Sequence, residues 1–302
     1  METGKSSGIP CQEESSKKKK RWRKYDGYKH WNEMAVSKIR SEVIAMIENL
    51  ESTKEIKIIL CGGTGEGISS LINNLCAAIR GTFAVVAQPS GYQQITKRYK
   101  VHHSTFEKDG QMRRLRLSFA DTPGFSGCPG HGSSAAAIQA CIMGKVANDE
   151  KIDPELTDSD WEQRVAVTTK ASFIFFVANA IFVPDDGNID RVQSRKRTYE
   201  SFQRIKAFSY DEGITVAAFL TNCDTLDEAV YNNVKNLYYS EKVKKKVEAF
   251  SRMIDVPKLR TYPIVNYKDN SNVTDRMVMQ ALIPLKECLI DIVSSIVCAK
   301  GR

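Results

Sequence analysis

The stretch KIILCGGTGEGISSLINNL places a glycine-rich turn between an apolar run and an amphipathic run. This order is typical of a phosphate-binding loop, G-x-x-x-x-G-K-[ST], whose lysine reaches the β- and γ-phosphates. Gly62, Gly67 and Ser69 are in register with the pattern, but Ile68 occupies the lysine position. Glu66 adds a negative charge where we expect phosphates to lie. The candidate phosphate-contacting residues are Gly62, Gly63, Thr64, Gly65, Glu66, Gly67, Ile68, Ser69 and Ser70.

A second motif, D-x-x-G, follows the apolar run RLRLSFA and comprises Asp121 to Gly124. In phosphate-loop GTPases the aspartate of this motif holds the Mg²⁺ water shell, and the glycine amide senses the γ-phosphate. Thr96 is placed like the switch threonine that meets Mg²⁺ when a γ-phosphate is present. The candidate Mg²⁺ ligands are therefore Ser69, Thr96 and Asp121, and the candidate switch residues are Thr96, Asp121 and Gly124.

A third motif, Thr221-Asn222-Cys223-Asp224, follows the run ITVAAFL in the register of the [NT]-K-x-D element of GTPases. There a carboxylate, here Asp224, accepts hydrogen bonds from the guanine base, and Asn222 takes the place of the lysine beside it. Each motif alone has a simpler explanation, because D-T-P-G also forms turns and T-N-C-D also caps helices. Their order, each directly after a strand, favours a GTPase-type site.

The elements that must position these motifs alternate along the chain. We expect strands at 55–61, 95–103, 113–121, 172–179, 214–222 and 260–266. We expect helices at 32–51, 69–80, 189–208, 238–253 and 275–297. Apolar strands alternating with helices predict an α/β fold with a mostly parallel central sheet and helices on both faces. With the motifs, this is a three-layer, P-loop GTPase-like fold.

The basic character of the chain is concentrated at its N-terminus. The net charge is +8, and residues 1–30 contain nine Lys or Arg against four Asp or Glu. We predict a disordered basic arm at residues 1–28 and a GTPase-like domain at 29–302, with a switch-region insertion at about 125–170. Residues 17–24, KKKKRWRK, could contact nucleic acid or an anionic membrane, with Trp22 stacking on a base or entering the interface. A solubilising arm and a nuclear localisation signal are the alternatives.

Cysteine usage and hydropathy suggest a compartment. The eight cysteines are scattered without metal-ligand spacing, which favours reduced thiols. The longest apolar run, FIFFVANAIFV, is too short to span a bilayer, and the polar start METGKSSGIP does not have the pattern of a signal peptide. We therefore expect no transmembrane segment and a cytoplasmic protein with nuclear access.

At this point the chain resembles the interferon-induced protein 44 family of GTPase-like proteins. The resemblance rests on RWRKYDGYKHW, CGGTGEGISSLIN, YQQITKRYKVH, FADTPGF and FLTNCDTLDEAV, and it covers residues 21 to 298. The segment ending in Val265-Asn266-Tyr267 is its most specific part and adds Asn266 to the candidate base-reading residues. The resemblance implies a dynamin-type GTPase fold, a cytoplasmic location, an antiviral or immune role, and protein partners that include a second copy of the chain.

The departures from the family pattern predict what the protein does. Ile68 and Asn222 replace two lysines, one at each end of a nucleotide, whereas the backbone amides of residues 63–69 still favour an anion. The leading hypothesis is a pseudo-GTPase with weakened or lost binding of GTP, GDP and Mg²⁺ that acts as an interaction module. The alternatives are a GTP-binding protein or slow GTP hydrolase with a substitute cation such as Lys97 or Arg98, and binding of nucleic acid or anionic lipid by the arm.

Overall fold

The computed structural model describes residues 21–24, 30–50, 55–88, 97–125, 133–153, 155–191, 193–266 and 273–300. Within these residues no helix combines the length and the apolar character that a membrane span requires. The cysteines described with their side chains are all buried and free, as the scattered spacing predicted.

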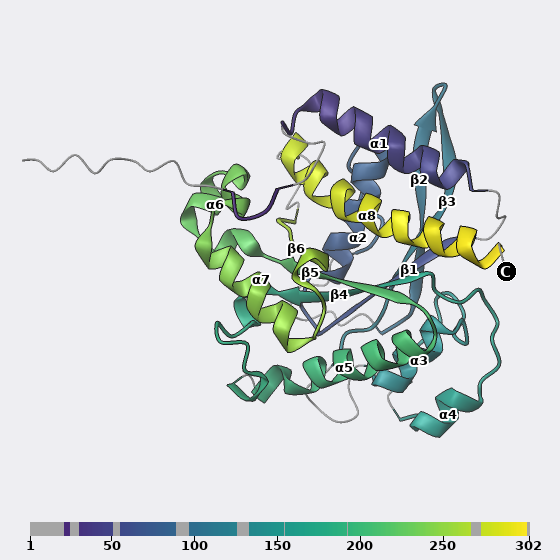
Figure 1. The fold of residues 1–302 in the computed structure, drawn as a ribbon. Helices are drawn as coiled ribbons and strands as arrows, with labels where there is room; N and C mark the ends of the chain where they lie inside the picture. The colour runs from purple at the N-terminus through teal and green to yellow at the C-terminus, as the bar shows by residue number, and fades with distance from the viewer. Residues whose placement is uncertain are drawn as a thin grey trace, which may run out of the picture.

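Six strands form one sheet in the order β2-β3-β1-β4-β5-β6 (Figure 1). All neighbouring pairs are parallel except β2 and β3, which are antiparallel. The strands are β1 Ile56–Gly62, β2 Lys100–Lys108, β3 Gln111–Asp121, β4 Phe173–Asn179, β5 Thr215–Thr221 and β6 Thr261–Pro263. Because β1 and β4 are buried along their whole length, the sheet must be covered on both faces.

The strands β2 and β6 differ most from their predicted bounds. β2 begins five residues later than expected and continues to Lys108, beyond its predicted end at residue 103. It is followed by a turn of Asp109 and Gly110, whose φ angles of 55° and 71° are those of a two-residue Asp-Gly hairpin. β6 is only three residues long, although the amide of Ile264 still donates to the Leu220 carbonyl at 2.9 Å.

Helices cover both faces of the sheet and give three layers (Figure 1). α1, α2 and α8 pack together on one face. α3, α5 and α7 lie on the other, where Phe250 of α7 contacts Phe202 of α5 with ring centroids 6.3 Å apart. The bounds are α1 Glu33–Glu48, α2 Ile68–Arg80, α3 Ala135–Ile142, α4 Asp158–Gln163, α5 Lys196–Asp211, α6 Glu228–Asn232, α7 Glu241–Met253 and α8 Asp275–Lys300. The predicted α/β class with a mostly parallel sheet is confirmed.

The segment predicted as a switch-region insertion contributes part of the core. α3 lies within it, and nearly all of its side chains are buried. α4 follows, and its N-cap is Thr157. The Thr157 hydroxyl accepts from the Asp160 amide, and the Asp160 carboxylate accepts from the Thr157 amide, which is a complete capping box.

The predicted disordered arm needs a correction at residues 21–24, which contact the domain. The amide of Trp22 donates to the Tyr238 carbonyl at 3.0 Å, and the two rings lie 5.5 Å apart. Arg23 is buried and donates to the Thr261 carbonyl at 2.8 Å. Trp22 therefore packs on the protein itself, which argues against the predicted role in base stacking. Residues 1–20, with the other lysines of the arm, lie outside the described residues.

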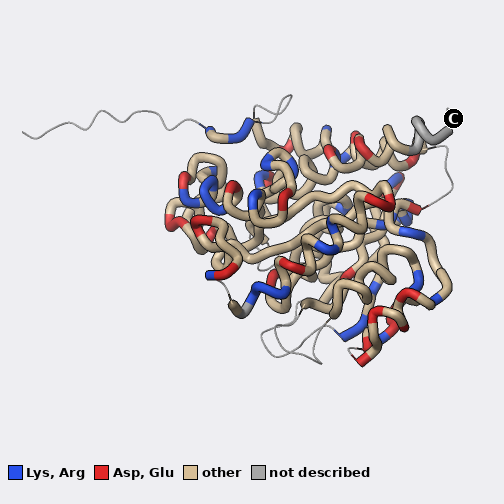
Figure 2. The backbone as a smooth tube through the Cα atoms, turned by 60° about the horizontal axis from the view of Figure 1, so that its bottom comes forward, with Lys and Arg blue, Asp and Glu red and all other residues tan. Residues whose placement is uncertain are grey.

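Charges of both signs are interspersed over the described surface (Figure 2). The four lysines of α7, at positions 242 and 244–246, illustrate the pattern. Lys244 pairs with Glu241 at 3.1 Å, and Lys246 pairs with Asp185 at 2.7 Å. Two of the four lysines at 242–246 are therefore paired with neighbouring carboxylates.

Candidate functional site

The predicted phosphate-binding loop, residues 62–70 (the phosphate loop), joins β1 to α2 at the carboxyl edge of the sheet. Gly65 and Gly67 have φ angles of 79° and 89°, a conformation that residues with a Cβ rarely adopt, so the turn requires both glycines. Gly67 is the N-cap of α2, so the amides of the first helical turn lie at the loop. A helix N-terminus in this position favours an anion. The loop therefore has the local geometry that its sequence predicts.

Not every amide of the loop faces a ligand. The Thr64 amide donates to the Phe125 carbonyl and the Glu66 amide to the Gly63 carbonyl, both at 3.2 Å. The expectation that all amides from residue 63 to residue 69 serve an anion is therefore wrong for these two. Phe125 directly follows the D-x-x-G motif, so the second motif hydrogen-bonds to the first.

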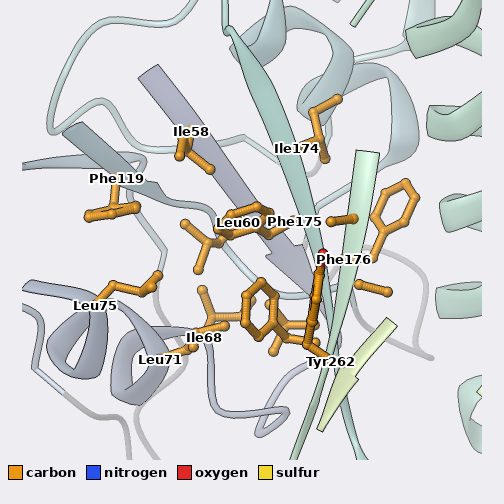
Figure 3. Close-up of a cluster of buried hydrophobic side chains, with 14 of the residues drawn as sticks. Ile58, Leu60, Ile68, Leu71, Leu75, Phe119, Ile174, Phe175, Phe176 and Tyr262 are labelled. Atoms are coloured by element: carbon orange, nitrogen blue, oxygen red, sulfur yellow. The ribbon is translucent and has the colours of Figure 1, made fainter. Parts of the chain in front are cut away.

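Ile68, in the lysine position, belongs to the hydrophobic core. Its side chain is 7% exposed and clusters with Leu71 and Leu75 of the same helix and with Leu60 of β1. Figure 3 shows Ile68 beside Leu71 and facing the sheet. This packing is consistent with the three- and four-residue spacing of the apolar residues along α2. No cation is therefore supplied to the loop from this position.

Glu66 does not lie where the sequence placed it. Its side chain is 1% exposed and is buried between the loop and the ends of β4 and β5. One carboxylate oxygen accepts a hydrogen bond from the Asn179 amide, and the other lies 3.0 Å from Nη1 of Arg195. The expectation that the Glu66 side chain lies among bound phosphates is therefore wrong, because it is buried against the protein. Burial raises the pKa of this carboxyl to about 7, and Arg195 and the Asn179 amide act against that shift.

Arg195 is a cation at the loop that the sequence analysis missed. It ends the 3-10 turn Gln193–Arg195 that precedes α5. Its Nη1 also donates to the Thr64 carbonyl at 2.9 Å, and its guanidinium lies 4.2 Å from the centre of the Phe182 ring. No local pattern marks this arginine, because it is 131 residues from Thr64 in the chain.

The substitute cations expected from the sequence are not supported. Nη1 of Arg98 donates to the Asp149 carbonyl at 2.6 Å, and it lies 3.8 Å from the Asp149 carboxylate. Arg98 is therefore engaged by the segment that follows α3. Lys97 is exposed, and its carbonyl accepts from the Ile152 amide at 3.1 Å.

Two of the predicted Mg²⁺ ligands meet. The Ser69 hydroxyl donates to the Asp121 carboxylate at 2.8 Å, and both residues are buried. Burial raises the pKa of Asp121 to about 6, with the Ser69 hydrogen bond and Lys100 opposing the shift. The third, Thr96, lies outside the described residues. Among the residues described, no group of three or more His, Cys, Asp or Glu could hold a metal ion, but Mg²⁺ commonly takes only one or two protein ligands and keeps several waters. A hydroxyl and a carboxylate at this separation fit such a site.

Gly124 of the D-x-x-G motif packs directly on the loop. A Cβ at this position would lie 2.7 Å from the Thr64 amide nitrogen and 2.9 Å from its Cα. Glycine is thus the residue that permits this approach. The structure brings the switch glycine and the phosphate loop into contact, as the motif order predicted.

The candidate base-reading residues lie at the same edge of the sheet. Asn222 adopts a left-handed conformation at φ 54°, and Asp224 is buried at the start of the following turn. Asn266 accepts a hydrogen bond from Asn74 of α2 at 2.8 Å, and its Nδ2 lies 3.1 Å from the point that a Cβ at Gly67 would occupy. The structure thus places Asn266 against the loop and α2.

Thr221 has a role that the sequence analysis did not assign. Its hydroxyl donates to the Glu66 carbonyl at 2.7 Å and lies 3.3 Å from the Ala178 carbonyl. The first residue of the third motif therefore holds the phosphate loop against β4 and β5. The only sequence feature that pointed to Thr221 was its match to the first position of the [NT]-K-x-D pattern.

No family model matches the chain. The chain is 25% identical over 239 residues to human interferon-induced protein 44-like, a match that covers 78% of this chain and 49% of that protein. The chain thus spans about half the length of this curated relative. The match agrees with the resemblance predicted from the motifs.

Solved structures with a similar arrangement include Toc33 from Arabidopsis thaliana in complex with GDP and Mg²⁺. It is 12% identical with a TM-score of 0.42, and the match covers 88% of this chain and 94% of that one. Translation elongation factor SelB from Methanococcus maripaludis is 12% identical with a TM-score of 0.37, over 80% of this chain and 34% of its own. At such scores the fold class rests on the strand order and the loop between β1 and α2. The chain is a GTPase-fold protein similar to human interferon-induced protein 44-like.

Proposed function

We propose that this chain is a pseudo-GTPase, in which the GTPase fold persists while guanine-nucleotide binding is weakened or lost. The observation that carries the proposal is the burial of Ile68, which puts an apolar side chain where a phosphate-binding lysine is required. The hydrogen bond between Ser69 and Asp121, the two predicted Mg²⁺ ligands, supports the part of the proposal that says the GTPase fold persists.

The size of the loss follows from the missing contact. Removing one partner of a desolvated charge pair costs about 2–5 kcal/mol. This corresponds to binding that is roughly 30-fold to several-thousand-fold weaker. Turnover suffers more than binding, because charge that develops on the leaving phosphate loses its main protein cation. If Mg²⁺ is bound, Ser69 and Asp121 would hold it, and it would neutralise phosphate charge there.

The role that we propose is that of an interaction module in an interferon-linked response. Similarity to a protein whose name records induction by interferon supports this context. In this proposal the GTPase-like domain, residues 29–302, provides a cytoplasmic surface for protein partners, including a second copy of the chain. Nucleotide turnover is not required for that role.

Titration of the purified chain with a fluorescent GTP analogue and Mg²⁺ tests the proposal. We expect a dissociation constant weaker than micromolar for the wild type and a clear gain in affinity for Ile68→Lys. Ile68→Met is the matched control, because it has a similar length without the charge, and it should not gain affinity. Micromolar or tighter binding by the wild type would defeat the proposal.

A working GTP-binding protein or slow GTPase is the second candidate. The observation in its favour is a guanidinium, that of Arg195, in contact with the loop backbone. This candidate predicts tight binding without any substitution, together with slow release of phosphate from GTP. The same titration, followed by a phosphate-release assay, separates the two.

A further inference from the structure

The phosphate loop has a pair of opposite charges directly beneath it. A Cβ at Gly63 would lie 2.8 Å from Nη1 of Arg195 and 3.0 Å from Oε1 of Glu66. Both charged groups therefore occupy the space under one peptide of the loop. Charges this close to the loop backbone act electrostatically on an anion that the loop amides bind.

Arg195 is held firmly in this place. It is 18% exposed, and the Thr64 carbonyl, the Glu66 carboxylate and the Phe182 ring each contact its guanidinium. These three contacts hold the guanidinium in one position, so its charge acts on the loop from a constant place. Glu66 is fixed equally well, because the Asn179 amide binds its second carboxylate oxygen.

The two charges must have opposite effects on a bound phosphate. A guanidinium beneath the loop attracts the anion, whereas the carboxylate beside it repels the anion and cancels much of that attraction. Because both groups are shielded from solvent, water screens their fields only weakly. A pair that served only to brace the loop would behave differently, since removing either member would loosen the loop and weaken binding.

We propose that Arg195 is the cation of this phosphate site, that it acts through the loop backbone in place of the missing lysine, and that Glu66 sets the affinity low by opposing it. The ligand class is a polyphosphate. The inference rests on the proposed function to the extent that the loop still accepts phosphate groups weakly.

Measuring polyphosphate affinity of charge variants tests the inference. The probes are inorganic tripolyphosphate, up to millimolar concentration, and a fluorescent GTP analogue, each with Mg²⁺ and at a pH above 7, where the Glu66 carboxyl is ionised. Glu66→Gln keeps the shape of the side chain and should bind about tenfold more tightly, whereas Arg195→Met should bind about tenfold more weakly. Arg191→Met removes the same charge from the neighbouring exposed turn and should leave affinity unchanged.

The test depends on whether the two substitutions change the polyphosphate affinity in opposite directions. Weaker binding by both Glu66→Gln and Arg195→Met, or no change in either, overturns the inference and identifies the pair as a brace. If wild-type binding is too weak to show a further loss, Arg195→Met is measured in the Ile68→Lys background. Glu66→Gln alone remains decisive if Arg195→Met does not fold, because a folded Glu66→Gln protein that does not bind more tightly contradicts the charge model.

Failure of the inference is distinguishable from failure of the proposed function. Micromolar binding by the wild type would remove the pseudo-GTPase proposal, but the signs of the two variants could still be read. Conversely, weak wild-type binding with variants that shift in the same direction would remove only the role of Arg195.

Discussion

The two sides of the phosphate loop differ in how they are held. On the ligand side, Ser69 and Asp121 meet through a hydrogen bond that a metal ion would replace. On the sheet side, Glu66 is bound through its carboxylate and its carbonyl, by Arg195, Asn179 and Thr221. The comparison shows that the shape of the loop is maintained by the protein itself, separately from the chemistry of its ligand. A loop built in this way can lose its lysine and keep its form.

The largest expected effect on stability comes from removing Arg195, the cation that pairs with Glu66 on the sheet side of the loop. Above pH 7, where the Glu66 carboxyl is ionised, Arg195→Met leaves this carboxylate buried without its ionic partner, and we expect a loss of about 4 kcal/mol in the free energy of unfolding. Urea denaturation measures this loss. Arg191→Met is the control, because its side chain is 71% exposed and should change stability by less than about 0.5 kcal/mol. Equal effects of the two changes would show that the buried pair does not stabilise the loop.

The next largest effect is the pH dependence of the free energy of unfolding that buried Glu66 causes. The folded protein retains the Glu66 proton up to about pH 7, whereas the unfolded chain releases it near 4.5. Between these values the folded state binds more protons, so the free energy of unfolding falls as the pH rises, by up to about 3 kcal/mol in total. Asp121 adds a fall of the same sign between 3.8 and about 6. Glu66→Gln should remove only the part of the slope that comes from Glu66, and an unchanged slope would refute this assignment.

A smaller effect is expected where the two charged groups crowd the backbone. Gly63→Ala places a methyl group within 3.0 Å of both Arg195 and Glu66, and we expect it to cost about 2 kcal/mol in the free energy of unfolding. The double variant Gly63→Ala with Arg195→Met tests the cause. If the clash with Arg195 is responsible, the two losses are less than additive, whereas simple additivity places the strain elsewhere.

The smallest expected effect is the loss of one hydrogen bond on the sheet side. Thr221→Val leaves the Glu66 carbonyl without its hydroxyl donor and should cost about 1 kcal/mol, measured by thermal denaturation. Thr225→Val is matched to it, because the Thr225 hydroxyl also donates to a carbonyl, that of Asn222, but at an exposed position. A loss of stability at Thr225 as large as that at Thr221 would mean that the contact with the loop stabilises the protein no more than an exposed hydrogen bond does.

Much of the site could be predicted because its signals are local. The burial of Ile68 follows from apolar residues three and four positions apart on one helix. The meeting of Ser69 with Asp121 follows from motifs that end neighbouring parallel strands. The bounds of β2 and the cap of α4 could not be predicted, because element boundaries depend on strand pairing and on which hydroxyl reaches an amide.

The sequence by itself determined the alternation of strands and helices, the order of the motifs and the absence of a lysine from the loop. Only the tertiary structure decided where the charges of Glu66 and Arg195 lie. A sequence pattern does not show which way the side chain of a loop residue points, and the partner of Glu66 comes from the turn that precedes α5. Burial then set the outcome, because a carboxylate that is removed from water must find a cation and a donor within reach of the fold.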